Sequence, residues 1–131
     1  MGDARNMNDS NGLRTGPTRG LRARTDAIYA RSAVDGETAT ECRVQVREAL
    51  EFVGAPARAA VYTDPGASGL DANRPALRRL LADVRLGGLR RVVVRDLARL
   101  ARSAPLLETI LGELRAAGVE LVTIGEWNRH A

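Results

Sequence analysis

The sequence of 131 residues contains no lysine, one cysteine, one histidine and very few aromatic residues. The single Cys42 excludes an internal disulfide framework, and together with the single His130 it cannot build a zinc site. We therefore expect no metal, and a cytoplasmic location as the default for such a chain. Because aromatics make up only 3% of the residues, a core must be built mainly from Leu, Val, Ile and Ala.

Long apolar runs are also missing. No window approaches the roughly 18 uninterrupted apolar residues that cross a membrane, so no membrane contact is expected. The N-terminus has no apolar stretch of the kind found in secretory signals. Residues 1–25 are rich in Gly, Asn and Arg, and we expect them to form a disordered basic arm. Residues 26–131 have the length of one domain with a modest core.

Arginine is abundant and supplies all 20 basic residues of the chain. Codon bias explains the lack of lysine about as well as chemistry does, but it does not explain the clustering. Residues 74–102 contain nine arginines and only two acids, whereas residues 103–131 contain two arginines and four glutamates. The stretch "RDLARLARS", residues 95–103, holds three of those nine arginines. Such a cluster of one sign is typical of a phosphate-binding surface.

Short β-branched runs alternate with amphipathic stretches. The pattern predicts strands at residues 26–31, 58–64, 90–97 and 119–125, and helices at 38–54, 74–88 and 104–118. Pro75 and Pro105 mark helix starts, and Gly54, Gly87 and Gly118 mark helix ends. This alternation predicts an α/β fold with a mostly parallel four-stranded sheet flanked by helices. In such sheets ligands bind at the carboxyl ends of the strands.

Three segments at those strand ends carry the residues suited to chemistry. They are "YARSAVDGE" (29–37), "YTDPGASGLDANRP" (62–75) and "RDLARLARS" (95–103). In this order and spacing they resemble the N-terminal catalytic domain of the serine recombinases, the resolvase and invertase family. That family reads approximately Tyr-x-Arg-x-Ser, then Asp-x-x-x-Ser-Gly with Arg-Pro soon after, then Leu-Asp-Arg-Leu-x-Arg. The resemblance covers about residues 27–126 and implies a resolvase-like three-layer domain.

The resemblance implies site-specific DNA recombination, in which a serine hydroxyl attacks a phosphodiester and forms a phosphoserine link. Arginine suits phosphoryl transfer because it is always protonated and binds phosphate through paired hydrogen bonds. The implied site residues are Arg31, Asp64, Ser68, Arg74, Arg99 and Arg102, with Ser32 as the candidate nucleophile. No metal or organic cofactor is implied, because side chains would supply both the nucleophile and the stabilising charge. DNA is the implied partner, together with a possible homo-oligomer.

The sequence departs from the family pattern at the nucleophile. Without an alignment gap, the family's serine falls on Ala33. Because side chains alternate along a strand, Ser32 should point away from the face that Arg31 and Ala33 share. A gap would bring Ser32 into register, but it would move Glu37 off the position where the family usually has glutamine. The ungapped alignment is therefore favoured, and Ser32 remains a candidate only if the strand end is shifted.

Two further departures concern the third segment. Asp96 stands where the family has a lysine, and Ala98 replaces the acid of its Asp-Arg pair. We therefore expect a degenerate active site. The chain also ends without the long helix and DNA-binding region that follow in the family, so a truncated domain is expected.

Three interpretations follow from these residues. One is an active recombinase domain, and the second is an inactive relative that acts as a DNA-binding or protein-interaction module. The third, a domain that binds a phosphorylated metabolite through "DPGASG", is disfavoured. That loop has neither the Gly-Lys-Ser/Thr ending of a P-loop nor a dinucleotide fingerprint.

Overall fold

The computed structural model describes residues 24–33, 38–54 and 59–125 of the chain. Its elements are β1 (Thr25–Arg31), α1 (Thr38–Val53), β2 (Ala60–Asp64), α2 (Pro75–Leu86), β3 (Leu89–Val94), α3 (Leu97–Leu100), α4 (Ala104–Ala116) and β4 (Glu120–Thr123). All predicted strands and helices are present, and α3 is the one element that the sequence pattern did not predict.

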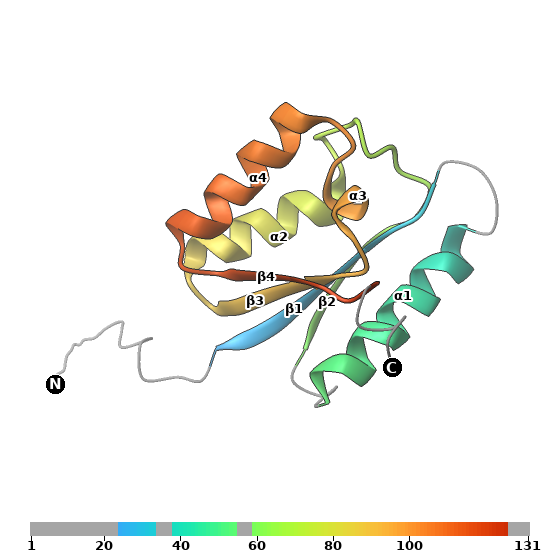
Figure 1. The fold of residues 1–131 in the computed structure, drawn as a ribbon, viewed down its shortest axis with the longest axis horizontal. Coiled ribbons are helices and arrows are strands. Elements are labelled where there is room, and N and C mark those ends of the chain that lie inside the picture. The colour runs from blue at the N-terminus through green and yellow to red at the C-terminus, as the bar shows by residue number, and fades with distance from the viewer. Residues whose placement is uncertain (1–23, 34–37, 55–58, 126–131) are drawn as a thin grey trace, which may run out of the picture.

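The four strands form one sheet in the order β2-β1-β3-β4, and every neighbouring pair is parallel. Helix α1 covers one face of this sheet, and α2 and α4 cover the other (Figure 1). The predicted three-layer α/β fold is confirmed. Because all strands run in the same direction, their carboxyl ends share one edge of the sheet.

Two apolar clusters hold the layers together. Ala27 and Tyr29 of β1 pack into the cluster beneath α2 and α4, whereas Ile28 packs into the cluster beneath α1. Val92 and Val93 of β3 divide in the same way. The central strands are thus buried on both faces, which explains their continuous apolar runs.

The helix-end signals act as the sequence predicted. Pro75 opens α2, where a missing N–H costs nothing. Gly87 ends it with φ of 90°, a left-handed conformation that favours glycine. Gly54 ends α1 in the same conformation, with φ of 74°.

The predicted third strand, residues 90–97, is too long. Strand β3 ends at Val94, and residues 97–100 turn into the short helix α3. Leu100 is fully buried in the cluster beneath α2 and α4, whereas Leu97 is 42% exposed. Carbonyl groups of this turn accept hydrogen bonds from two arginine side chains, and this tertiary contact is invisible in the local sequence pattern.

Among the described residues, no helix is long and apolar enough to cross a membrane. In the same part of the chain, no group of three or more His, Cys, Asp or Glu side chains is placed to hold a metal ion. The arm predicted over residues 1–25 lies outside the described residues except for Arg24 and Thr25, and Thr25 already begins β1. His130 lies outside them as well.

Candidate functional site

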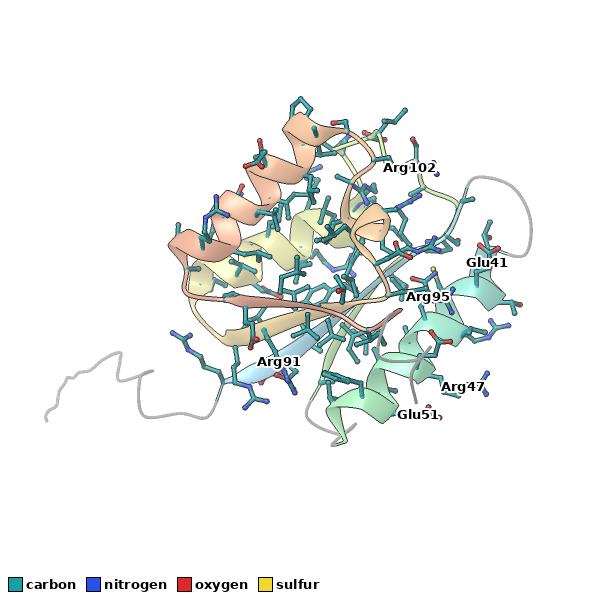
Figure 2. All side chains as sticks on the ribbon, viewed as in Figure 1. Glu41, Arg47, Glu51, Arg91, Arg95 and Arg102 are labelled. Carbon is teal, nitrogen blue, oxygen red and sulfur yellow. The ribbon has the colours of Figure 1, made fainter. Side chains whose placement is uncertain are left out.

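The carboxyl edge of the sheet brings together residues that are far apart in the sequence. Arg31 ends β1, Asp64 ends β2, and Arg74 directly precedes α2. Arg99 lies in α3, and Arg102 follows it on the rim of this edge (Figure 2). Ser68 lies in the loop between β2 and α2.

Arg31 is buried, with 3% of its surface exposed. Its guanidinium donates to three main-chain oxygens, those of Ala67 at 2.7 Å, Ala98 at 2.8 Å and Arg99 at 3.2 Å. It therefore ties the β2–α2 loop and α3 to the end of β1. Burial, and next the charge of the nearby Arg74, lowers the pKa of the Arg31 guanidinium. An arginine nevertheless stays protonated in a protein, so the site holds a buried positive charge.

Arg74 is buried still more completely, at 1% exposure. It donates to the carbonyl groups of Asp71 at 2.7 Å and Arg99 at 3.0 Å, to that of Leu100, and to the Tyr29 hydroxyl at 3.1 Å. These contacts occupy most of its five N–H donors. Arg74 thus supports the loop around α3 from beneath and has little capacity left for a ligand.

Asp64 is also committed to the fold. Its carboxylate accepts hydrogen bonds from the main-chain N–H groups of Ala76 and Leu77, both at 2.9 Å, at the start of α2. The negative charge there stabilises the helix terminus. The Tyr29 hydroxyl donates to the same carboxylate at 2.7 Å. Burial, reinforced by this hydrogen bond, raises the pKa of Tyr29.

Ser32 is completely buried. Its Oγ accepts a hydrogen bond from the Gly66 N–H at 3.0 Å, and its carbonyl accepts one from the Ala67 N–H at 3.2 Å. The hydroxyl also contacts the Cys42 thiol, whose pKa is raised by burial and partly lowered by this hydrogen bond. Ala33, the next residue, is exposed. Ser32 contacts α1, whereas the Arg31 guanidinium contacts α3, so these two neighbouring side chains point in different directions as the strand pattern predicted. Ser32 holds the β2–α2 loop from inside.

The outer part of the site is made by Ser68 and Arg102. Ser68 is half-buried, and its Oγ accepts a hydrogen bond from the Leu70 N–H at 3.0 Å. Arg102 is exposed, and its guanidinium makes no hydrogen bond to any residue in the described part of the chain. Its main-chain N–H donates to the Gly69 carbonyl at 2.9 Å, which joins the two loops.

Arg99 is held less firmly than the buried arginines. Its Nη1 donates to the Arg31 carbonyl at 3.3 Å. Its Nε lies 3.6 Å from the Asp96 carboxylate, which is too long for a hydrogen bond. That Nε is buried without a hydrogen-bond partner. The Arg99 side chain is nevertheless 23% exposed, and an external anion could meet this exposed part of it.

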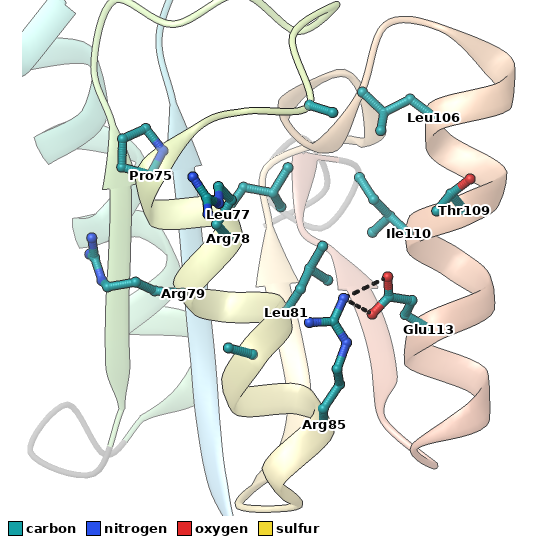
Figure 3. Close-up of a pocket in the computed structure, with 12 residues that line it drawn as sticks. Pro75, Leu77, Arg78, Arg79, Leu81, Arg85, Leu106, Thr109, Ile110 and Glu113 are labelled. Carbon is teal, nitrogen blue, oxygen red and sulfur yellow. Dashed lines mark hydrogen bonds and ion pairs between the residues drawn. The ribbon is translucent and has the colours of Figure 1, made fainter.

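Arginines of the same sequence cluster also lie away from this site. Arg95 points to α1, where it pairs with Glu48 at 2.8 Å (Figure 2). Arg78, Arg79 and Arg85 line a separate groove of about 780 Å³ between α2 and α4 (Figure 3). Arg85 is neutralised there by Glu113 at 2.7 Å.

Gln45 of α1 is a residue of this edge that the sequence pattern did not predict. This side chain is 3% exposed, donates to the Arg31 carbonyl at 2.9 Å and accepts from the Arg31 N–H at 3.3 Å. Strand β3 ends before it reaches Arg31, so the end of β1 lacks main-chain partners on that side. The Gln45 side chain supplies hydrogen bonds in their place. A signal was present, because Gln45 lies three residues after Cys42 and four before Ala49, on the buried face of the helix.

The fold and this edge define an α/β domain with an arginine-rich site at the carboxyl ends of its strands. The chain matches the family model described as "Resolvase, N terminal domain" over residues 27–130. The chain therefore belongs to the resolvase-type serine recombinase family, as a catalytic domain. The predicted family resemblance is confirmed. Among the curated proteins, none matches this sequence.

Solved structures of serine recombinases are similar to the chain. A serine recombinase from Sulfolobus solfataricus is 30% identical, with a TM-score of 0.67, over 78% of this chain and 69% of its own. The N-terminal catalytic domain of TP901-1 integrase is 26% identical, with a TM-score of 0.66, over 79% and 78%. The C-terminal catalytic domain of IS1535 TnpA, an IS607-like serine recombinase, is 30% identical, with a TM-score of 0.58, over 74% and 68%.

Proposed function

We propose that this domain binds the phosphate backbone of DNA through Arg99 and Arg102, and that it does not cleave DNA through Ser32. The domain then acts as a DNA-binding relative of active recombinases. A homo-oligomer is part of the same proposal, as expected for a member of the resolvase family.

The charge balance of the edge supports phosphate binding. Four arginines lie there: Arg31, Arg74, Arg99 and Arg102. Of the two nearby acids, Asp64 caps α2 and Asp96 is 3.6 Å from Arg99. The two buried guanidinium groups are satisfied by carbonyl oxygens, which carry no formal charge. An excess of positive charge therefore remains at the rim, and it attracts anions.

The burial of Ser32 is the observation that argues against cleavage. A nucleophile must approach a phosphorus atom, and a hydroxyl with no exposed surface cannot do so. Its lone pair is also engaged by the Gly66 N–H. The exposed neighbouring position, Ala33, has no hydroxyl. Both features favour the inactive relative over the active recombinase.

Cleavage is tested by incubating the protein with supercoiled plasmid and looking for a covalent protein–DNA adduct. We expect none from the wild type or from Ser32→Ala. An active serine recombinase run in parallel shows that the assay detects adducts. An adduct formed by the wild type and lost in Ser32→Ala would overturn the proposal.

Binding is tested by the affinity for duplex DNA as a function of salt. We expect a steep fall in affinity with salt, because bound phosphates release counterions. Arg99→Ala should weaken binding while the domain stays folded by circular dichroism. A flat salt response would count against phosphate contacts, and an unfolded Arg99→Ala would make Arg99 a structural residue.

A further inference from the structure

We infer that Gly69 is a positioning residue for Arg102: the missing side chain at Gly69 lets the stem of Arg102 lie across the loop and directs its guanidinium to the rim. This inference rests on the proposed DNA binding. It names the residue that positions one of the two proposed DNA-binding side chains.

The space at Gly69 is already filled by arginine side chains. A Cβ atom added there would lie 2.5 Å from Cγ and 2.9 Å from Cδ of Arg102. It would also lie 3.0 Å from Nη2 of Arg31. Separations below 3.0 Å are far inside van der Waals contact, so a side chain at this position requires Arg102 to move.

The backbone conformation does not explain the glycine. Gly69 is not one of the glycines with positive φ among the described residues, which are Gly54, Gly66, Gly87 and Gly118. An alanine could adopt its conformation. The reason for a glycine is therefore the close approach of a neighbouring group. Besides positive φ, close approach is the other common reason for a glycine.

Two contacts together determine where the Arg102 side chain goes. The Arg102 N–H donates to the Gly69 carbonyl at 2.9 Å, which fixes the start of the side chain over the loop. The Cγ and Cδ atoms then lie in the space that a Cβ of residue 69 would occupy. The buried Arg31 and Arg74 are oriented by hydrogen bonds of their guanidinium groups, whereas that of Arg102 has none to any described residue. Packing of its stem is what orients it.

Gly69→Ala should displace Arg102 and require only a small adjustment of the Arg31 guanidinium, whose Nη2 lies 3.0 Å from the added Cβ. Arg102 is exposed and can rotate into solvent, whereas the buried Arg31 is held by three carbonyl groups. A displaced Arg102 loses its phosphate contact. We expect a loss of DNA affinity close to that of Arg102→Ala, about tenfold at low salt, with the log–log salt slope reduced by about 0.9 in both variants.

A double-mutant cycle separates positioning from a general effect on the loop. If Gly69 acts through Arg102, then Gly69→Ala should change little further in the Arg102→Ala background, because the two shortest contacts are gone and only the 3.0 Å approach to Nη2 of Arg31 remains. Additive losses of affinity would overturn the inference. If Gly69→Ala alone unfolds the domain, the double variant Gly69→Ala/Arg102→Ala should be folded. A double variant that is also unfolded would overturn the inference.

Gly112→Ala is the matched control. Gly112 lies in α4, and a Cβ atom added there meets nothing within 4 Å. Its DNA affinity and salt slope should equal those of the wild type. If Arg102→Ala does not change DNA binding, the proposed function fails. If Arg102→Ala weakens binding and Gly69→Ala does not, only the positioning role fails.

Discussion

The two ends of the parallel sheet both collect arginines but balance their charge differently. At the amino end, Arg90 and Arg91 each donate two hydrogen bonds to the carboxylate of Asp26, at 3.0 to 3.1 Å. At the carboxyl end, Arg31 and Arg74 donate to neutral oxygens of the main chain and of Tyr29. At the amino end, one carboxylate offsets part of the charge of the two guanidinium groups. At the carboxyl end, the direct partners of Arg31 and Arg74 carry no formal charge.

The amino end is therefore a structural ion pair. Asp26 has 11% of its side chain exposed, and burial alone would raise its pKa. The hydrogen bonds from Arg91 and Arg90 outweigh burial and lower the pKa of this carboxyl group. Arg91 also lies over the Phe52 ring, 5.4 Å from its centroid. The difference between the two ends teaches that a count of arginines does not show which of them pair with a carboxylate, whereas their hydrogen-bond partners do.

The largest effect should come from removing a buried arginine of the carboxyl end. Arg74→Ala leaves several buried carbonyl groups without donors and creates a cavity, so we expect a loss of roughly 3 to 5 kcal/mol in the free energy of unfolding. Urea denaturation measures it. Arg90→Ala, which removes an arginine whose side chain is 58% exposed at the other end, should cost far less, because solvent screens its ion pair with Asp26. Equal losses would contradict the comparison.

Ser32→Ala should give the next largest effect, because it removes the hydroxyl that satisfies the Gly66 N–H inside the site. Leaving a buried donor unpaired costs about 1 to 3 kcal/mol. Thermal unfolding would show this loss, and the same variant should bind DNA as tightly as the wild type where it is folded. An unchanged stability would mean that the hydroxyl is not needed to hold the loop.

Asp26→Asn should destabilise the amino end by roughly 1 to 3 kcal/mol near neutral pH, since it removes charged hydrogen bonds. The pKa of Asp26 is lowered in the folded state, so its contribution is present above the ordinary value of 3.8. That contribution disappears as the pH falls through the lowered pKa. Unfolding measured from pH 7 down to pH 2 should show the two proteins converging in stability. A constant difference would mean that the ion pair contributes nothing.

The smallest effect on stability, but a clear one on binding, is expected for Arg102→Ala. The exposed side chain should change the free energy of unfolding by less than about 0.5 kcal/mol. The log–log salt slope of DNA binding should fall by about 0.9, as for one lost phosphate contact. Arg90→Ala removes the same charge at the amino end and should leave the slope unchanged. A similar fall of the salt slope in both variants would mean that DNA binding depends only on the net charge of the protein.

Much of the fold could be predicted because the local signals agree with one another. The β-branched run around Val92 predicted a buried parallel strand, and Pro75 and Gly87 marked the two ends of α2 correctly. The short helix α3 was missed because its turn is stabilised by Arg31 and Arg74, which are distant in sequence. Four residues also contain too little periodicity to reveal a helix.

The sequence predicted that these residues share one edge of the sheet. It only partly predicted which of them support the fold and which are left free to meet a ligand. Spacing brought Arg31, Arg74, Arg99 and Arg102 to one edge, and alternation along the strand turned Ser32 inward. No local pattern distinguishes an arginine that supports a loop from one that meets a ligand. Burial and hydrogen-bond partners make that distinction, and both arise only when the three segments meet.

The sequence by itself determined the layer architecture, the family and the edge at which the arginines gather, because these depend on periodicity and on the order of short motifs. Only the tertiary structure decided which guanidinium groups are satisfied by carbonyl oxygens and which remain available. It also decided that Gly69 lies beneath the stem of Arg102. The physical reason is that desolvation and packing depend on neighbours from distant segments, which no single stretch of the chain contains.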